Sequence, residues 1–149
     1  MYYKLLLLFM CFGLLFNVAH AGEKYTITGD VSFQYDEDIY MCLCTKEEWS
    51  EFLIPGHELS QPPCKFIKMN SDLKKAGKVS FKLDNIPKGI YVIIAYQDVN
   101  KNKKVDYENY LMNEPWGTYK EGDPVSSMPS WDLRKFTLEK DIEGIKIQM

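Results

Sequence analysis

The sequence predicts an all-β protein, an antiparallel β-sandwich of about seven strands. Short segments in which apolar and polar residues alternate recur along the chain, and this period of two is typical of strands. Aromatic residues make up 14% of the chain, including ten Tyr, a residue type that favours strands. With 149 residues, of which 46% are hydrophobic, the chain can build one domain with a core.

The first 21 residues have the form of a cleavable secretory signal. Lys4 supplies a positive start, and an apolar run follows over residues 5–16. Ala19 and Ala21 are small residues at the two positions that a signal peptidase reads, so we expect cleavage after Ala21. The sequence therefore predicts an exported protein, secreted or held in the periplasm or outer envelope, with a single domain over residues 22–149.

Two other interpretations of this segment remain. The apolar run is shorter than the roughly 20 residues of an ordinary membrane span, so an uncleaved anchor is the weaker alternative. A lipoprotein signal at Cys11 fits less well, because Met10 stands where a small residue is expected. No later segment is long and apolar enough to span a bilayer, so we expect no transmembrane segment after cleavage.

The charge of the predicted mature chain disfavours nucleic acid as a partner. Removal of Lys4 leaves 17 basic against 21 acidic residues, so the net charge moves from −3 to −4. No basic cluster stands out against this acidic balance. The expected partner is an extracellular or envelope component that the sequence does not identify.

The first strands and a helix are expected in the N-terminal third. Residues 25–35 alternate between an apolar and a polar face, and residues 39–44 are apolar on both faces, as in a central strand. Thr45 and Glu48 form a capping box, which predicts a short helix over 46–53, inserted between two strands. Pro55 ends this helix.

Further strands are expected over residues 65–69, 78–83 and 90–97, the last being the most apolar run of the domain. Residues 71–77 are polar and predict a turn between the first two.

The C-terminal part begins with a long irregular segment, from residue 98 to 129, and such segments are uncommon unless they are functional or tied down. Strands over 133–139 and 142–147 close the domain.

Three cysteines remain after cleavage, Cys42, Cys44 and Cys64, and an oxidising compartment favours one disulfide. Cys42 and Cys44 share one face of a strand, so either is a candidate partner of Cys64. A zinc site that uses these residues and His57 lacks the usual ligand spacing.

The segment from Asp98 to Asp106 is the main candidate site. Side-chain oxygens recur at its positions 1, 3, 5 and 9, which are Asp98, Asn100, Asn102 and Asp106, and the carbonyl of Lys104 falls at position 7. Calcium takes six to eight oxygen ligands, and this alternation wraps a short loop around one ion. The pattern predicts a calcium site built by these five residues.

Departures from that pattern predict weak binding. Lys103 stands where a glycine usually makes the sharp turn, and Asn109 stands where a bidentate Glu is usual, so Glu108 or Glu114 would have to serve. The lysines within the loop also oppose a cation. The alternative is a polar turn without an ion, in which the Asp and Asn side chains bond their own backbone.

An aromatic cluster follows the loop, and Trp116, Tyr119 and Trp131 are its candidate binding residues. Exposed Trp and Tyr can stack on sugars or bury in a partner, so a carbohydrate- or peptide-binding module is the alternative function. The plainer interpretation is that these rings cover one end of the sandwich.

The order of several motifs resembles the secreted bacterial family catalogued as domain of unknown function 2141. The motifs extend from Phe81 to Phe136 and include the loop pattern and residues 114–117 and 129–131. The resemblance implies a β-sandwich of the transthyretin-like or carboxypeptidase-regulatory-like type, and it implies no activity.

Catalytic constellations are missing from the sequence. His57 is the one histidine of the mature chain, and no Gly-x-Ser-x-Gly elbow or phosphate-binding loop occurs. A Cys–His pair of Cys64 and His57 is the weak enzymatic alternative. We therefore expect an exported, non-catalytic β-sandwich module with calcium as its one candidate cofactor.

Overall fold

The computed structural model describes residues 22–58, 64–108, 111–120 and 130–149. The predicted signal segment, residues 1–21, lies outside the described residues, as does Asn109. Within the described residues, no helix is both long enough and apolar enough to cross a bilayer.

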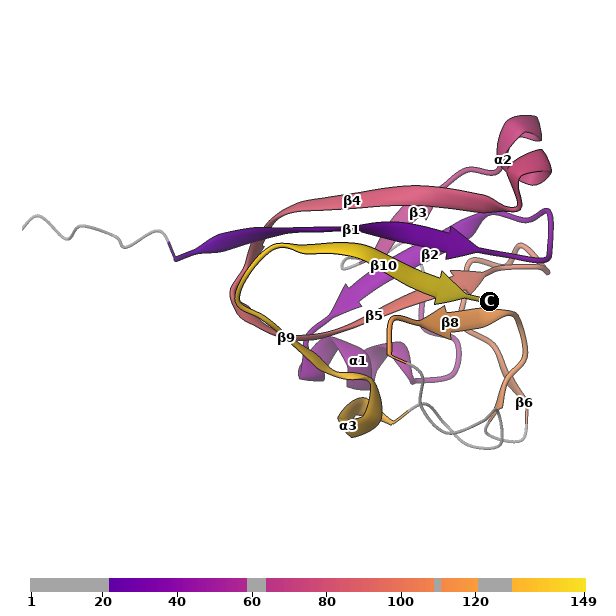
Figure 1. Cartoon of the computed structure of the whole chain (residues 1–149). Coiled ribbons are helices and arrows are strands. Elements are labelled where there is room, and N and C mark those ends of the chain that lie inside the picture. Colours follow the sequence, from indigo (N-terminus) through magenta and orange to yellow (C-terminus); the bar gives the residue numbers. More distant parts are fainter. Residues whose placement is uncertain (1–21, 59–63, 109–110, 121–129) are drawn as a thin grey trace, which may run out of the picture.

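Two sheets form the body of the fold (Figure 1). The first has the order β10-β1-β4, from Ile142–Gln148, Lys24–Ser32 and Lys78–Pro87. The second has the order β3-β2-β5-β8, from Cys64–Ile67, Ile39–Cys44, Gly89–Gln97 and Trp116–Thr118, and β9 (Phe136–Leu138) also pairs with β5. A separate two-stranded hairpin joins β6 (Tyr107–Glu108) to β7 (Leu111–Met112).

The predicted all-β sandwich is confirmed. Inward-facing side chains of both sheets form the main core, among them Ile27, Val31, Ile93 and Ile145, each at most 2% exposed. Among the described strands, one pair is parallel, because the C-terminal strand β10 runs parallel to β1, and the other pairs are antiparallel. This pairing joins the two ends of the domain, which is a non-local contact that strand patterns do not reveal.

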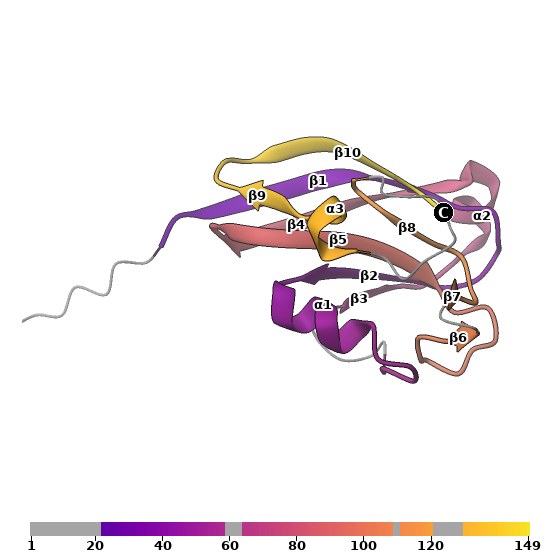
Figure 2. The same cartoon turned by 90° about the horizontal axis from the view of Figure 1, so that it is seen from below.

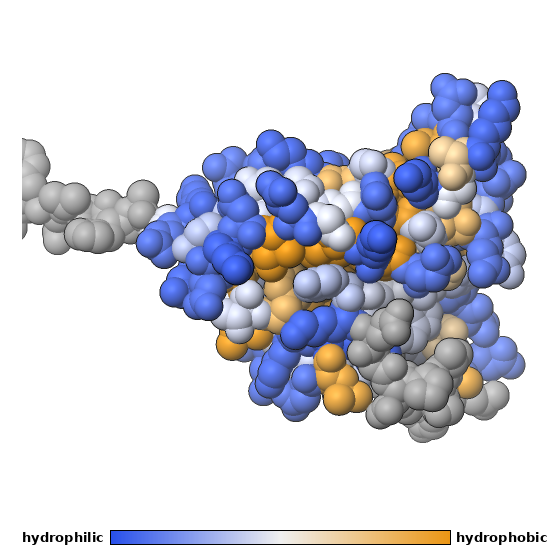
Figure 3. All heavy atoms as spheres, viewed as in Figure 1, coloured by the Kyte–Doolittle hydropathy of each residue, from blue (hydrophilic) through white to orange (hydrophobic). Residues whose placement is uncertain are grey.

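The alternation of β1 and β4 directs polar side chains away from the core. Thr28 lies opposite Lys82 and Asp30 opposite Ser80, and the Ser80 hydroxyl donates to Asp30 at 2.6 Å. Figure 3 shows mainly hydrophilic residues over the face seen in Figure 1, with apolar ones visible between them. The outer face of this sheet is therefore the solvated one.

A third layer covers the outer face of the second sheet (Figure 2). It contains α1 (Lys46–Phe52), the β6–β7 hairpin and α3 (Trp131–Arg134). Trp49 and Phe52 of α1 pack with Tyr40, Val92 and Tyr96 of the sheet in a second core. Strand β2 and the part of β5 from Val92 onward are consequently buried on both faces, which explains why their sequences are almost entirely apolar.

Helix α1 begins as predicted. Thr45 accepts from the Glu48 amide at 3.4 Å, and Glu48 accepts from the Thr45 amide at 2.7 Å, which is a complete capping box. The helix ends at Phe52, one residue before the predicted end.

Residues 71–77 were expected as a turn and instead form α2 (Ser71–Ala76). Asn70 caps the helix, and Gly77 ends it in the left-handed conformation, at φ 62°. The helix has no buried residue, so the sequence lacks the apolar stripe that would have predicted a helix here.

The irregular segment expected from residue 98 to 129 also contains structure, because β6, β7 and β8 all lie within it. Strand β8 approaches β10 very closely at Gly117, where an added Cβ would lie 2.1 Å from the Gln148 carbonyl oxygen. The two sheets therefore come together along this side of the sandwich.

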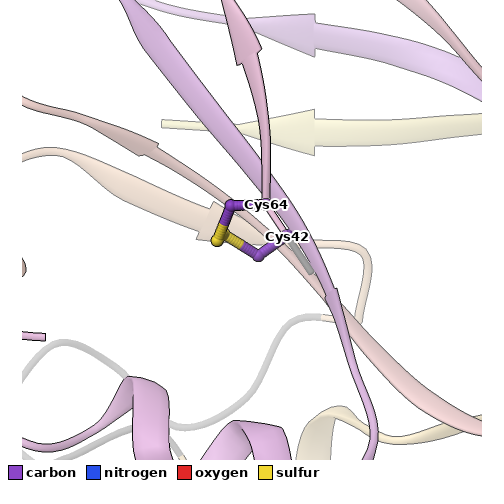
Figure 4. Close-up of a disulfide and its surroundings, with 2 residues drawn as sticks. All are labelled: Cys42 and Cys64. Atoms are coloured by element: carbon purple, nitrogen blue, oxygen red, sulfur yellow. A yellow bond between two sulfur atoms is a disulfide. The ribbon is translucent and has the colours of Figure 1, made fainter. Parts of the chain in front are cut away.

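The disulfide joins Cys42 to Cys64 (Figure 4). These residues lie directly opposite each other in the antiparallel β2–β3 pair, with Cα atoms 3.9 Å apart. Cys44 is the remaining cysteine of the part of the chain that the structure describes, and it is completely buried on the same face of β2 as Cys42. The register between β2 and β3 thus selects one of the two pairings that the sequence left open.

Candidate functional site

The 98–106 loop begins directly after β5 and reaches β6. Lys101 and Lys103 have positive φ angles, 62° and 60°, so the chain reverses direction at two left-handed residues. Lys103 occupies the position where a glycine was expected. The sharp turn therefore forms without the glycine, although a lysine adopts this conformation less readily.

Side chains of the loop bond its own backbone. The Asp98 carboxylate accepts from the amides of Asn102 at 3.1 Å and Lys103 at 2.8 Å. Asn100 Oδ1 accepts from the Asn102 amide at 3.0 Å, and Asn102 Oδ1 accepts from the Lys104 amide at 2.8 Å. These are the bonds of the polar turn that the sequence offered as the alternative to an ion site.

Three of the five predicted ligand residues are joined through their side chains. Asp106 Oδ2 accepts from the side-chain amides of both Asn100 and Asn102, at 2.7 Å each. Asp98 is 4% exposed, and its carboxylate bonds the backbone amide of Asn102. Hydrogen bonds within the loop thus connect Asp98, Asn100, Asn102 and Asp106.

The fifth residue, Lys104, was proposed through its carbonyl. Its amide bonds Asn102, and its backbone forms an isolated antiparallel bridge with Glu58. Its side chain is exposed. The backbone of Lys104 is therefore held by Asn102 and Glu58, and none of these contacts places its carbonyl near the other predicted ligands.

A buried tyrosine and a buried glutamate form the base of the loop. The Tyr96 hydroxyl donates to Glu114 Oε2 at 2.5 Å and accepts from the Asp106 amide at 3.1 Å. Glu114 Oε1 accepts from the Asn100 amide at 2.9 Å. Burial is the main cause that raises the pKa of Tyr96, so the hydroxyl keeps the proton that it donates. The pair ties both ends of the loop to β5.

Glu114 was named from the sequence as a substitute for the missing Glu at position 12, and it does contact the loop. Glu114 is 9% exposed. Tyr96 was not predicted, because a tyrosine in the most apolar strand was assigned to the core. The only sequence signal was its place two residues before Asp98.

The charges of the loop are unevenly paired. Lys101 makes an ion pair with Glu37 of the β1–β2 turn, with Nζ and Oε2 3.1 Å apart. Within the described residues, no basic side chain forms an ion pair with the carboxylates of Asp98, Asp106 or Glu114. Three carboxylates therefore lie in or under one loop, and the donors that hold them among the described residues are neutral.

The loop was also compared with the usual metal sites, which are built from His, Cys, Asp and Glu side chains. Within the described ranges, no group of three or more His, Cys, Asp and Glu side chains is arranged to hold a metal ion. The predicted ligand set includes two asparagines, and asparagine is not one of these four residue types. Calcium accepts amide oxygens as ligands, so the donor set fits calcium better than zinc.

The three predicted aromatic binding residues do not form one platform. Trp116 and Trp131 pack against the second core, and the Arg134 guanidinium lies 5.1 Å from the centre of the Trp116 ring. Tyr119 packs against the main core, edge-on to Phe136 with ring centres 5.3 Å apart. All three side chains are partly buried. These contacts match the plainer interpretation, in which the rings pin the irregular segment to the sandwich.

The disulfide removes the nucleophile of the weak enzymatic alternative, the pair of Cys64 and His57. Cys64 is bonded to Cys42, so it offers no thiol to His57. The His57 ring packs against Phe52 instead, with ring centres 5.8 Å apart. Burial raises the pKa of the Cys44 thiol to about 12, which disfavours the reactive thiolate.

Comparisons with known proteins identify a family. No curated protein and no solved structure is detectably similar to the chain. A family described as an uncharacterized protein conserved in bacteria matches residues 38–146, which is more than half of the sequence. The matched region includes α1, both buried central strands and the whole 98–106 loop. The chain therefore belongs to this bacterial family, domain of unknown function 2141.

Proposed function

We propose that the protein is an exported, non-catalytic β-sandwich module whose 98–106 loop binds calcium weakly and is stabilised by it. The observation that carries this proposal is the convergence on Asp106 Oδ2 of the amides of Asn100 and Asn102, with Asp98 across the loop. Export is expected from the N-terminal 21 residues.

The existing hydrogen bonds are compatible with a cation site. An amide or carboxylate oxygen that accepts one backbone N–H keeps a second lone pair, so the turn holds the ligands in place without exhausting them.

The charges favour a divalent ion over an empty loop. Asp98 and Asp106 place two carboxylates on one short loop, and a cation bound to both would relieve their repulsion. Glu114 lies beneath the loop, where its oxygens accept from Tyr96 and Asn100. Lys101, Lys103 and Lys104 are exposed on the outside of the loop, and Lys101 is already paired with Glu37. Their repulsion weakens the site, so we expect a dissociation constant of about 0.1–1 mM, which is usual for extracellular calcium modules.

A calcium titration by isothermal calorimetry tests the proposal. We expect one calcium ion per chain, no comparable binding of magnesium, and loss of binding in Asp98→Asn and Asp106→Asn. Asp36→Asn is the matched control, because Asp36 is an exposed carboxylate in the adjacent β1–β2 turn, paired with Lys74. Absence of calcium binding to the unaltered protein at millimolar concentration would refute the proposal.

A further inference from the structure

Strand β4 forms a free edge of the first sheet. In the order β10-β1-β4, β1 is its neighbour among the described strands, and Figure 1 shows β4 along the outer border of the sheet. The polar side chains of β4 from Lys78 to Asp84 are exposed, whereas those of the central strand β1 are mostly half-buried. The opposite edge is less open, because β10 lies close to Gly117 of β8. An edge such as β4 presents backbone amides and carbonyls that another strand can pair with.

The part of β4 that can pair regularly with another strand is residues 78–84, which we call the β4 edge. Its ladder with β1 is regular from Lys78 to Leu83 and shifts beyond that point. Asn85 has a left-handed φ of 63°, which ends the regular extended backbone. Helix α2 packs beside the start of the strand, so the β4 edge begins at Lys78. This span is longer than the usual strand of about 5–6 residues, so it offers a full ladder to a partner.

The charges of the β4 edge are complementary about its central residue, Phe81. Lys78 lies three residues before Phe81, and Asp84 lies three residues after it. When two copies pair antiparallel with both Phe81 residues on the two-fold axis, each Lys78 lies opposite Asp84 of the other copy. Opposite charges at directly facing positions stabilise a pair of strands. The β4 edge is therefore complementary to a second copy of itself.

The same register also matches the two faces of the sheet. On the outer face, Ser80 lies opposite Lys82 of the other copy. On the inner face, Val79 lies opposite Leu83, and the two Phe81 residues face each other. Val79 and Phe81 are buried in the main core of each copy, and Leu83 is partly buried against it. The apolar side chains of the two chains thus continue one inner face, and the polar side chains continue one outer face.

Neighbouring registers are disfavoured by the two lysines of the β4 edge. A shift of one residue would place polar side chains opposite apolar ones, so only shifts of two residues keep the faces matched. Such a shift in one direction places Lys82 opposite Lys82, and in the other direction it places Lys82 opposite Lys78. Like charges at facing positions destabilise a strand pair. The lysines, which commonly protect an edge strand from pairing, thus leave the register around Phe81 open.

We propose that the β4 edge is a self-association surface: a second copy of the chain pairs with it antiparallel around Phe81, and the two three-stranded sheets join into one continuous sheet. Each Asp84 then lies between its own Lys82, whose Nζ is 3.0 Å from Asp84 Oδ1, and Lys78 of the second copy. The pairing uses the free edge of both copies, so the assembly closes as a dimer. It involves no residue of the 98–106 loop and is independent of the calcium proposal.

Sedimentation equilibrium of the chain from Gly22 onward measures the association directly. The measurement is made in EDTA, so its outcome does not depend on calcium. A single strand pair buries less area than a standard interface, so concentrations up to about 1 mM are needed. We expect an equilibrium between monomer and dimer, with no larger species.

Charge reversal tests the register. Lys78→Asp and Asp84→Lys each place two like-charged pairs across the dimer, so we expect the dissociation constant to rise by about tenfold or more in each variant. An equimolar mixture of the two variants restores opposite charges at both positions, and it should associate as the unaltered protein does. Glu143→Lys is the matched control, because Glu143 is exposed on β10 at the other edge of the sheet. This control should leave the dissociation constant unchanged.

Three results would overturn the proposal. The first is an unaltered protein that stays monomeric at every concentration. The second is a dimer that Lys78→Asp and Asp84→Lys leave unchanged, because such a dimer forms through another surface. The third is a mixture of the two variants that does not recover the association although melting temperatures show both to be folded, because the two charges then do not face each other.

Discussion

Replacement of Tyr96 by Phe tests whether the base of the loop is held by one hydroxyl. This hydroxyl donates to the buried Glu114 carboxylate and accepts from the Asp106 amide. A hydrogen bond to a charged group contributes about 1.5–3 kcal/mol, and the lost acceptor for Asp106 adds to this. We expect Tyr96→Phe to lower the free energy of unfolding by about 3 kcal/mol.

Tyr107 offers a control with the same chemical change. Its hydroxyl oxygen is buried and has no hydrogen-bond partner among the described residues, and burial raises its pKa. Tyr107→Phe removes an unsatisfied polar atom, so stability should stay the same or rise by up to about 1 kcal/mol.

Urea denaturation of both variants measures the difference, with melting temperature as a second measurement. A loss of 3 kcal/mol corresponds to a fall of about 10 °C for a domain of this size. Equal effects of Tyr96→Phe and Tyr107→Phe would refute the reasoning, because burial alone would then explain both. A larger loss in Tyr107→Phe would contradict it more strongly.

Three other predictions concern the fold. Gly117→Ala should cost about 1–3 kcal/mol in urea denaturation, because its Cβ would meet the Gln148 backbone; an unchanged midpoint would show that β8 can move away from β10. Thr45→Ala should cost about 1 kcal/mol through loss of the α1 cap, and Ser50→Ala, on the exposed side of α1, should cost less. Cys44 has a pKa raised by burial from 9.0 to about 12, so it stays protonated in the folded protein while the unfolded chain ionises. Stability should therefore be complete below about pH 9 and fall between pH 9 and pH 12, and Cys44→Ala should flatten that fall; a pH dependence identical to that of the unaltered protein would contradict this assignment.

Local patterns in the sequence predicted the parts of the fold that depend on local interactions. The alternation in β1 and the capping box of α1 are decided within a few residues, and both elements formed, although β1 ends at Ser32 instead of residue 35 and α1 ends at Phe52 instead of residue 53. Helix α2 was not predicted because it lacks an apolar stripe, although it has caps at both ends. Its end is marked only by the left-handed conformation of Gly77.

The parts of the fold that the sequence did not predict depend on pairing between distant segments. Whether Cys42 or Cys44 bonds Cys64 depends on the register of β2 against β3, which the sequence does not contain as a local pattern. The same holds for the parallel β1–β10 pair and for the third layer over the second sheet. Each requires knowledge of which distant segments meet.

The candidate site also combines features that local spacing predicts with contacts from distant segments. The oxygens at Asp98, Asn100, Asn102 and Asp106 follow from spacing, and the structure brings these residues together. Tyr96 on β5 accepts from the Asp106 amide, and the His57 carbonyl after α1 accepts from the Val105 amide, so both contacts come from segments that fold against the loop. No pattern within the loop could reveal them.

The most direct test of the calcium proposal is the melting temperature of the chain from Gly22 onward, measured in EDTA and in 5 mM calcium. A ligand that binds only the folded state stabilises it by about 1 kcal/mol at five times its dissociation constant, which is a rise of roughly 2–5 °C here. We predict that rise for calcium, its absence with magnesium, and its loss in Asp106→Asn. The same melting temperature in EDTA and in calcium would contradict the account and leave the loop a polar turn.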